Sequence, residues 1–245
     1  MRAIRLYVPQ SLSLLQELKL TEEPLHYALN VLRINKNSTL NLFNGDGNEY
    51  ACEITQLTKK SLEVKITAQQ QVTNNPPIAI DLYLGISKSS HMDYAIQKTV
   101  EAGVSNIYPV ITERSVAKLS NKSAKNKVAH WEKIIISACE QCGRAELPEL
   151  HAFQELTDIP TLNSNEIGFL LDAKAEQSLK SFAGENFNSI KLIIGAEGGL
   201  SVSEISSLRK KNYHAITLGP RILRTETAAL SAVICAQLYW GDLAQ

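Results

Sequence analysis

Two glycine-containing segments near the C-terminus carry the residue types best suited to bind a small molecule. Residues 192–200 read Leu-Ile-Ile-Gly-Ala-Glu-Gly-Gly-Leu, and residues 218–228 read Leu-Gly-Pro-Arg-Ile-Leu-Arg-Thr-Glu-Thr-Ala. Each adjoins an apolar run typical of a buried strand, and glycine after such a strand lets the backbone approach a ligand where a Cβ atom would collide. Open α/β sheets bind small molecules just beyond the carboxyl ends of their strands. Both segments are therefore predicted to line a binding site.

The glycine spacing excludes the two commonest nucleotide-binding loops. The first segment lacks the Gly-Lys-Ser/Thr ending of a P-loop, and the carboxylate of Glu197 would repel a phosphate. Gly195, Gly198 and Gly199 do not follow the Gly-x-Gly-x-x-Gly spacing of dinucleotide-binding folds. Neither a nucleoside triphosphate nor a dinucleotide is therefore the expected ligand.

The pair of segments resembles the cofactor-binding motifs of the SPOUT class of trefoil-knotted RNA methyltransferases. In detail it is similar to the family that methylates N3 of uracil in 16S, small-subunit ribosomal RNA, over almost the whole chain. The string at 221–228 is the most specific motif. Two positions depart from the family pattern, because Ala196 stands where proline is usual and Tyr27 follows His26 where a second histidine is common. The other matching residues are Leu25, Val31, Leu32, Arg33, Asn44, Gly45, Asp46, Gly47, Gln97, Lys98, Glu101, Ala102, Gly103, Glu113, Arg114, Ser115, Trp131, Ala138, Glu140, Gln141 and Arg144.

This resemblance implies S-adenosylmethionine as the cofactor. Methyl transfer from a sulfonium requires the nucleophile, the methyl carbon and the sulfur to be aligned, and such alignment is worth about 7–11 kcal/mol. Glycines and backbone groups suit the task because they can hold the adenosine without covering the methyl group. The expected cofactor-binding residues are Leu171, Gly195, Glu197, Gly198, Gly199, Leu218, Gly219, Ile222 and Leu223.

The same resemblance implies that the site must ionise its substrate. Uracil N3 carries a proton and becomes a good nucleophile only after that proton leaves. A cation close to the uracil carbonyls would stabilise the resulting anion, and Arg224 is the expected catalytic cation. Glu226 is expected to accept the proton or to orient Arg224, although a carboxylate in the first turn of a helix is favoured without any catalytic role. His26 is expected to be a surface or packing residue.

The segment 114–127 contains five cations and no acidic residue. Blocks of like charge occur in interaction segments and in solvated loops, so phosphate binding and simple solvation both stay open for it. Gln97 and Glu101 fall one turn apart on one helix face, which fits a solvated face or an RNA-facing one. The expected RNA-binding residues are Arg5, Arg33, Lys88, Gln97, Lys98, Arg114, Lys118, Lys122 and Arg144.

Overall composition is that of an ordinary globular protein. The chain has 245 residues, of which 44% are hydrophobic and 20% charged, and its formal net charge is zero. No global field therefore attracts it to nucleic acid or to an acidic membrane. No apolar run approaches the ~20 residues of a membrane span, and a soluble, cytoplasmic protein is expected. Cys139 and Cys142 form a C-x-x-C, but without a second pair or a suitably spaced histidine they are interpreted as free thiols, and no metal is expected.

Residues 1–72 are predicted to form a small β-rich domain, which resembles a PUA-like RNA-binding barrel. Strands are expected at 5–8, 38–43, 49–57 and 61–67, and a helix at 21–32. The sequence Asn-Gly-Asp-Gly at 44–47 is strong turn chemistry between two of these strands. A polar stretch at 69–77 ends in two prolines and marks the domain boundary.

Residues 73–245 alternate between strand and helix patterns, which predicts an α/β domain with a largely parallel sheet and helices on both faces. Strands are expected at 78–86, 106–111, 167–171, 191–194 and 215–218, and helices at 90–102, 128–142 and 224–240. The last helix is apolar almost all round, so it is expected to pack on the sheet and also on a partner chain. The trefoil knot, and a homodimer with its site near the interface, follow from the resemblance alone.

The leading functional hypothesis is methylation of uracil N3 in small-subunit ribosomal RNA, with the free RNA or the assembled 30S subunit as substrate. A second hypothesis is ribose 2′-O-methylation of transfer or ribosomal RNA. A third, from a different class, is a catalytically silent RNA-binding factor of ribosome assembly, against which the intact glycine loops argue. The sequence leaves the target nucleotide and the proton acceptor open.

Overall fold

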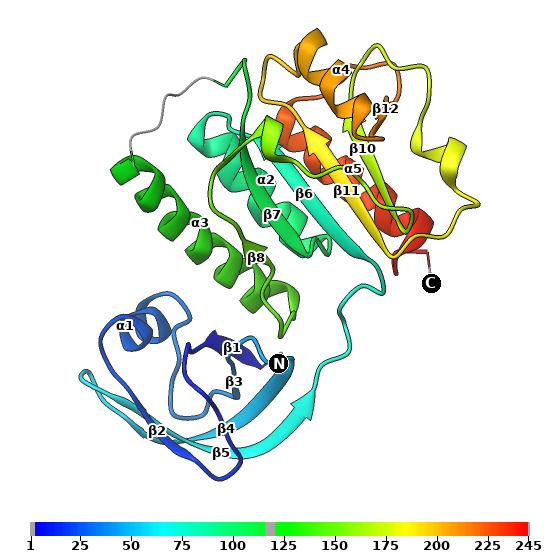
Figure 1. Cartoon of the computed structure of the whole chain (residues 1–245). Coiled ribbons are helices and arrows are strands. Elements are labelled where there is room, and N and C mark those ends of the chain that lie inside the picture. The colour runs from blue at the N-terminus through cyan, green and yellow to red at the C-terminus, as the bar shows by residue number, and fades with distance from the viewer. Residues whose placement is uncertain (1–2, 116–120, 245) are drawn as a thin grey trace. The chain divides into compact units, whose positions relative to one another are not determined.

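The computed structural model describes residues 3–115 and 121–244. These residues form two compact units, coloured by position along the chain in Figure 1. The first unit is Met1–Asn75 together with Cys139–Leu147, and the second is Pro76–Ala138 together with Pro148–Gln245. The polar stretch before the two prolines thus lies where the first unit gives way to the second.

The first unit is built around one five-stranded sheet. Its elements are β1 (Ile4–Tyr7), β2 (Glu17–Leu20), α1 (Glu22–Asn30), β3 (Leu40–Phe43), β4 (Asn48–Leu57) and β5 (Leu62–Gln71). The strand order is β1-β3-β4-β5-β2, in which β1 and β3 are parallel and the remaining pairs antiparallel. Leu40, Leu62 and Ile66 are fully buried in its core. Of these elements, the sequence pattern did not predict β2.

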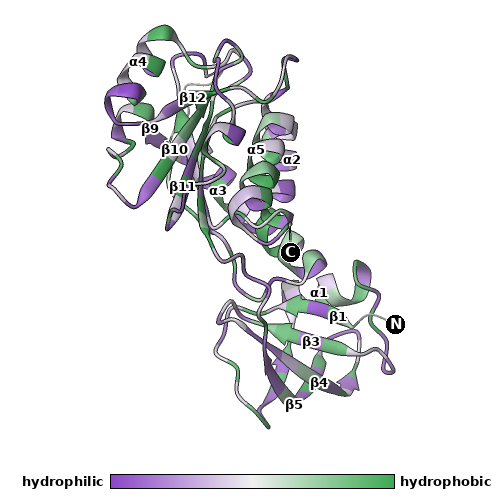
Figure 2. Ribbon diagram, turned by 90° about the vertical axis from the view of Figure 1, so that its right-hand side faces the viewer, coloured by the Kyte–Doolittle hydropathy of each residue, from purple (hydrophilic) through white to green (hydrophobic). Residues whose placement is uncertain are grey.

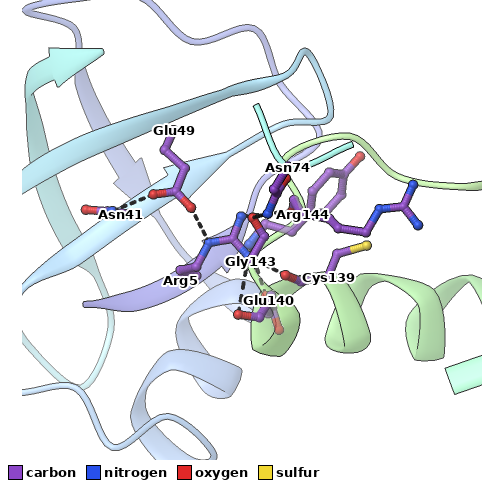
Figure 3. Close-up of polar contacts among 9 residues, drawn as sticks. Arg5, Asn41, Glu49, Asn74, Cys139, Glu140, Gly143 and Arg144 are labelled. Atoms are coloured by element: carbon purple, nitrogen blue, oxygen red, sulfur yellow. Dashed lines mark hydrogen bonds and ion pairs between the residues drawn. The ribbon is translucent and has the colours of Figure 1, made fainter. Parts of the chain in front are cut away.

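Arg5 of β1 is buried and anchors the end of a distant helix to this sheet (Figure 3). Its guanidinium donates to the Glu49 carboxylate and to the carbonyl oxygen of Cys139, and its Nη2 donates to the Arg144 carbonyl at 2.8 Å. A buried guanidinium is stable only when its donors are satisfied. Arg5 therefore holds the chain at 139–144, which explains why this stretch belongs to the first unit.

Glu140 completes that attachment. One oxygen of its carboxylate accepts the Tyr7 N–H at 3.0 Å, and the other accepts the Tyr27 hydroxyl at 2.8 Å. Burial raises the pKa of Glu140 more than these hydrogen bonds and the Arg5 charge lower it, so the pKa lies above its usual range. The side chain is thus a structural link between β1, α1 and the residues at 139–147.

The second unit contains a parallel sheet of seven strands. Its strands are β6 (Ala79–Gly85), β7 (Asn106–Ile111), β8 (Glu149–Leu150), β9 (Gln154–Glu155), β10 (Glu166–Leu171), β11 (Ser189–Ile194) and β12 (His214–Ile216). The order is β12-β10-β11-β6-β7-β8, with β9 also pairing with β7, and every one of these pairings is parallel. The prediction of an α/β domain with a parallel sheet is confirmed.

Helices cover this sheet, as Figure 1 shows. They are α2 (Ser89–Glu101), α3 (Asn121–Cys142), α4 (Val202–Lys210) and α5 (Thr225–Trp240), with short 3-10 turns η1 (Leu156–Asp158) and η2 (Leu179–Phe182). α3 begins earlier than the predicted 128, and α4 was not predicted. α5 packs against α2, β11 and β6, and its middle turns contain mainly apolar residues. Figure 2 colours the ribbon by hydropathy. Among the described residues, no helix is both long enough and apolar enough to cross a membrane.

A buried ion cluster lies towards the amino ends of the central strands. Lys191 Nζ is 2.8 Å from Asp81 Oδ2 and 3.1 Å from Glu166 Oε1, and the Asn106 amide donates to Asp81 Oδ1 at 2.7 Å. Burial disfavours the Lys191 charge, but the two carboxylates outweigh this and raise its pKa. These contacts join β6, β7, β10 and β11, and so fix the strands whose opposite ends carry the site.

Candidate functional site

A cavity of about 840 Å³ lies at the carboxyl ends of the parallel strands. β6, β10, β11 and β12 end at Gly85, Leu171, Ile194 and Ile216, and the segments that follow each of them contribute to the lining. Eight of the nine predicted cofactor-binding residues line the cavity, and the ninth, Gly219, lies in the same loop as its neighbour Leu218. The lining residues among those predicted are Leu171, Gly195, Glu197, Gly198, Gly199, Leu218, Ile222, Leu223 and Arg224.

The glycines of the first loop are required by the folding of the loop itself. A Cβ atom on Gly195 would lie 2.7 Å from the Gly199 carbonyl carbon and 2.9 Å from the Leu200 nitrogen. Gly199 has φ +68°, a conformation that L side chains rarely adopt. A Cβ on Gly198 would come within 3.1 Å of the Arg114 side chain. The loop therefore folds back tightly on itself, and this compact shape forms one wall of the cavity.

Two hydrogen bonds, each between a side chain and a backbone group, hold the loop in place. Arg114, three residues beyond β7, donates from Nη1 to the Gly198 carbonyl at 2.6 Å. The Lys88 N–H, just before α2, donates to Glu197 Oε1 at 3.0 Å. Partial burial alone would raise the pKa of Glu197, but the N–H groups of Lys88 and of Glu197 itself, with the nearby His91, hold the pKa below its usual range. Glu197 is thus an ionised wall residue, which suits a cationic or hydroxyl-bearing ligand and not a phosphate.

The second loop leads into α5 and presents Arg224 to the cavity. Arg224 is the residue before the first turn of α5, its side chain is exposed, and it lines the cavity. Within the described residues its guanidinium has no ion-pair partner. In the same loop Gly219 has φ +84°, and its carbonyl accepts the Thr217 hydroxyl at 2.9 Å. Arg224 is therefore free to interact with a substrate held against the cavity.

Glu226 does not itself line the cavity. It is 9% exposed, and its Oε2 is 3.8 Å from Nδ1 of His91. His91, in the first turn of α2, also lies 3.4 Å from Glu197 Oε1 and lines the cavity. Reasoning from the sequence did not identify His91, although its place at the start of a helix that follows a strand could have drawn attention to it. Glu226 is better placed to interact with His91 than with a substrate.

The predicted RNA-binding residues are distributed unevenly. Lys88 and Arg114 line the cavity, and Arg33 is exposed in the first unit. Lys122 lines a second hollow of about 620 Å³ with Ser89, Ser123, Asn126, Lys127 and His130, between the first turns of α2 and α3. Basic side chains beside helix N-termini suit phosphate groups. Lys118 lies outside the described residues.

The other predicted RNA contacts have partners within the protein. Arg5 is buried and bonded within the first unit, so its position does not fit the predicted contact with RNA. Arg144 is 7% exposed. On α2, Gln97 is half-buried, and Lys98 forms an ion pair with Glu101 at 2.8 Å. Their burial and their contacts within the protein favour a structural role over direct contact with RNA.

One further cavity, of about 910 Å³, lies beside the start of β12. It is lined mainly by polar residues that include Lys174, Arg209, Asn212 and His214, and by none of the predicted site residues. It lacks the close-packed glycine loops and the convergence of strand ends that characterise the first cavity. Position relative to the sheet, and not volume, favours the first cavity as the binding site.

Comparison with known proteins identifies the family of this chain. Residues 74–237 match a family described as an RNA methyltransferase domain, and residues 20–67 match an RNA methyltransferase PUA domain. The chain is 34% identical over 245 residues to the ribosomal RNA small subunit methyltransferase E of Buchnera aphidicola, covering 99% of this chain and 98% of that protein. This chain belongs to the RNA methyltransferase family. The predicted SPOUT class and PUA-like N-terminal domain are confirmed.

Two solved structures extend that similarity to the fold. A Legionella pneumophila methyltransferase in complex with S-adenosylmethionine has a TM-score of 0.93 and 36% identity, covering 99% of this chain and 100% of that one. A ribosomal RNA small subunit methyltransferase E from Neisseria gonorrhoeae, bound to S-adenosylmethionine, has a TM-score of 0.89 and 33% identity, covering 99% and 100%. Both relatives bind the predicted cofactor.

Proposed function

We propose that this protein transfers a methyl group from S-adenosylmethionine to N3 of a uracil in small-subunit ribosomal RNA. The observation that carries the proposal is the cavity at the carboxyl ends of β10, β11 and β12, which is walled by the two glycine loops. Family membership and cofactor-bound relatives support the cofactor and the RNA class. The choice of uracil N3 rests on the resemblance of the motif at 221–228 to that of the uracil-N3 family.

The cavity fits S-adenosylmethionine in its chemistry. Leu171, Leu218, Ile222 and Leu223 provide apolar side chains suited to enclose an adenine ring, and the loop backbones supply polar groups beside them. The ionised Glu197 suits ribose hydroxyls or a cationic ligand. When bound there, S-adenosylmethionine supplies an electrophilic methyl group on a positively charged sulfur. The protein's own residues must then orient the uracil and stabilise its ionised form.

Arg224 is proposed as the catalytic residue that stabilises the ionised uracil. Arg224 lines the cavity, and its guanidinium has no ion-pair partner among the described residues, so it can pair with the uracil oxygens as N3 loses its proton. An interaction made only along the reaction path does not appear in ground-state affinity. Glu226 is proposed to act through His91 and not as the proton acceptor, because it lies outside the cavity lining.

A single-turnover assay tests the assignment of Arg224. With cofactor and RNA both saturating, Arg224→Ala is expected to lower the methylation rate by about 10²–10³, the effect of losing one preorganised charge-stabilising donor. Higher pH should partly restore the variant because hydroxide then supplies the uracil anion. A loss of cofactor affinity in proportion to the rate would assign Arg224 to binding instead.

The RNA is proposed to contact the basic hollow beside α2 and α3, with residues 1–72 as a second RNA-binding domain. A homodimer is proposed through α5 and α2, because Ile234, Leu238 and Tyr94 on these packed helices are 40%, 48% and 46% exposed. Such exposed apolar side chains on two adjacent helices suit a protein interface. The trefoil knot stays a prediction from the SPOUT resemblance.

Mass spectrometry of the product tests the proposed reaction. Ribosomal RNA and 30S subunits from a strain that lacks this protein are incubated with it and with labelled S-adenosylmethionine, and the RNA is digested to nucleosides. Label in N3-methyluridine is expected. More label in 30S subunits than in free ribosomal RNA would indicate that subunit assembly precedes methylation, and the reverse would indicate that methylation comes first. Label in a 2′-O-methylnucleoside would favour the ribose reaction. Tight cofactor binding with no transfer to either substrate would favour a silent assembly factor.

A further inference from the structure

His91 stands between two carboxylates that come from two other parts of the fold. Its Nδ1 is 3.4 Å from Oε1 of Glu197, in the loop after β11, and 3.8 Å from Oε2 of Glu226, in the first turn of α5. The three side chains are 27%, 30% and 12% exposed. One ring nitrogen of α2 therefore faces two acidic groups at the edge of the cavity.

Protonation of His91 would offset one of the two negative charges of this cluster. His91 Nδ1 and Glu226 Oε2 are both buried atoms without a hydrogen-bond partner in the described structure. If the imidazole were neutral, the carboxylates of Glu197 and Glu226 would face a ring without charge. Two uncompensated negative charges are costly in a partly buried place. An imidazolium donates its Nδ1–H and offsets one of the two charges. Within residues 3–115 and 121–244, His91 is the only ion-pair partner of either carboxylate.

The surrounding charges do not take over this role. The other charged side chains that line the cavity are Lys88, Arg114, Asp172, Lys174, Arg221 and Arg224. None of them forms an ion pair with Glu197 or Glu226 in the part of the chain that the structure describes. Lys88 contributes only its backbone N–H to Glu197, and Arg114 bonds the Gly198 carbonyl.

We propose that His91 is a positioning residue whose protonated imidazole ties the glycine loop at 195–200 and the first turn of α5 to the start of α2. Because Arg224 immediately precedes that turn, the tie would fix both the cofactor-binding wall and the proposed catalytic cation. The inference rests on the proposed function for the identity of the ligand, but not for the tie itself, which involves only residues of this chain.

The tie makes the site sensitive to pH in a defined direction. Histidine side chains lose their charge between about pH 5 and pH 8. A tie of the proposed kind requires a charged imidazole, so it should weaken towards the alkaline end of that range. Lysine at this position would keep the positive charge throughout that range, and glutamine would lack it throughout. His91→Lys and His91→Gln therefore separate the charge from the packing of the side chain.

Calorimetric titration with S-adenosylmethionine from pH 6 to pH 8.5 tests the proposal on the parent and both variants. As pH rises, the affinity of the parent for S-adenosylmethionine is expected to fall about threefold to tenfold relative to that of His91→Lys. This magnitude lies between the effect of a surface ion pair and that of a buried charge-assisted hydrogen bond. His91→Gln should be weak at every pH. The ligand's amino group also titrates near about pH 8, so the comparison between variants, and not the parent curve alone, is the quantity to measure.

Thermal unfolding of the free protein gives a second readout that needs no cofactor. The midpoint of the parent should fall relative to that of His91→Lys between pH 6 and pH 8, and His91→Gln should show no such change. Identical profiles for parent and His91→Gln in both experiments would overturn the proposal. A single-turnover rate that rises with pH in the parent and is lost in His91→Lys would overturn it in favour of His91 as the proton acceptor. Absence of cofactor binding in the parent at every pH would refute the proposed function, and the unfolding series would still decide the tie.

Discussion

Adding a single methyl group to Gly195 should damage the cofactor site more than its size suggests. The new Cβ would lie 2.7 Å from the Gly199 carbonyl carbon and 2.9 Å from the Leu200 nitrogen, and both of these are backbone atoms. Neither contact can be relieved by rotation of a side chain, so the loop must move. Overpacking of this kind typically costs about 1–3 kcal/mol.

Part of that cost should appear as weaker cofactor binding, because the displaced loop is a wall of the cavity. If the folded protein retains the loop displacement, 1–3 kcal/mol corresponds to roughly a 5- to 150-fold loss of affinity, at about 1.4 kcal/mol per factor of ten. Any part of the cost that movement of the loop does not relieve lowers the free energy of unfolding. Calorimetric titration and urea unfolding together account for both.

Two other glycines provide matched controls. Gly184 is exposed, and a Cβ there would meet nothing within 4 Å, so Gly184→Ala should leave affinity and stability nearly unchanged. Gly199→Ala introduces no collision but places alanine at φ +68°, which costs about 1–2 kcal/mol. Equal affinity and equal stability of Gly195→Ala and Gly184→Ala would refute the argument that close packing of the loop shapes the site.

Further predictions concern the thiols, the buried ions and the basic hollow. A hydrogen bond from the Cys139 thiol holds the pKa of Cys142 below its usual range, and burial raises the pKa of Cys52 to about 11. Alkylation of Cys142 should therefore begin at a lower pH than alkylation of Cys52, as peptide mass spectrometry across a pH series would show, and the reverse order would contradict this. Lys191→Met should lower the unfolding free energy by about 3–5 kcal/mol because it leaves buried carboxylates uncompensated, and urea denaturation that shows no loss would contradict this. Neutralising Lys122 and Lys127 together should reduce the slope of log affinity for RNA against log salt by roughly 0.7–0.9 per lost phosphate contact without changing cofactor affinity, and an unchanged slope would leave these lysines as ordinary solvated residues.

Local patterns in the sequence were sufficient to predict most of the elements. The strand at Asn106–Ile111 agrees with its prediction at both ends, and the helix before Gly103 ends at Glu101, as the glycine suggests. The parallel sheet followed from the alternation of strands and helices. α4 was missed although its capping box, Ser201 with Glu204, is a local signal that the sequence contains.

Contacts between distant segments could not be predicted in this way. Arg5 was expected at the RNA surface, but its donors are used by carbonyl groups more than 130 residues away in sequence. His91 acquires its significance only because Glu197 and Glu226 reach it from two other elements. Hydrophobic periodicity describes one element at a time and carries no information on which polar groups will meet across the fold.

Hydrogen–deuterium exchange with and without S-adenosylmethionine tests the central claim most directly, because it reports where the cofactor binds. The site at the strand ends predicts slower exchange in peptides covering residues 194–200 and 216–224, which form the two loops of the cavity. It predicts no change in residues 209–213, beside the larger cavity near the start of β12. Protection confined to residues 209–213, with none in the two loops, would place the cofactor elsewhere and contradict the account.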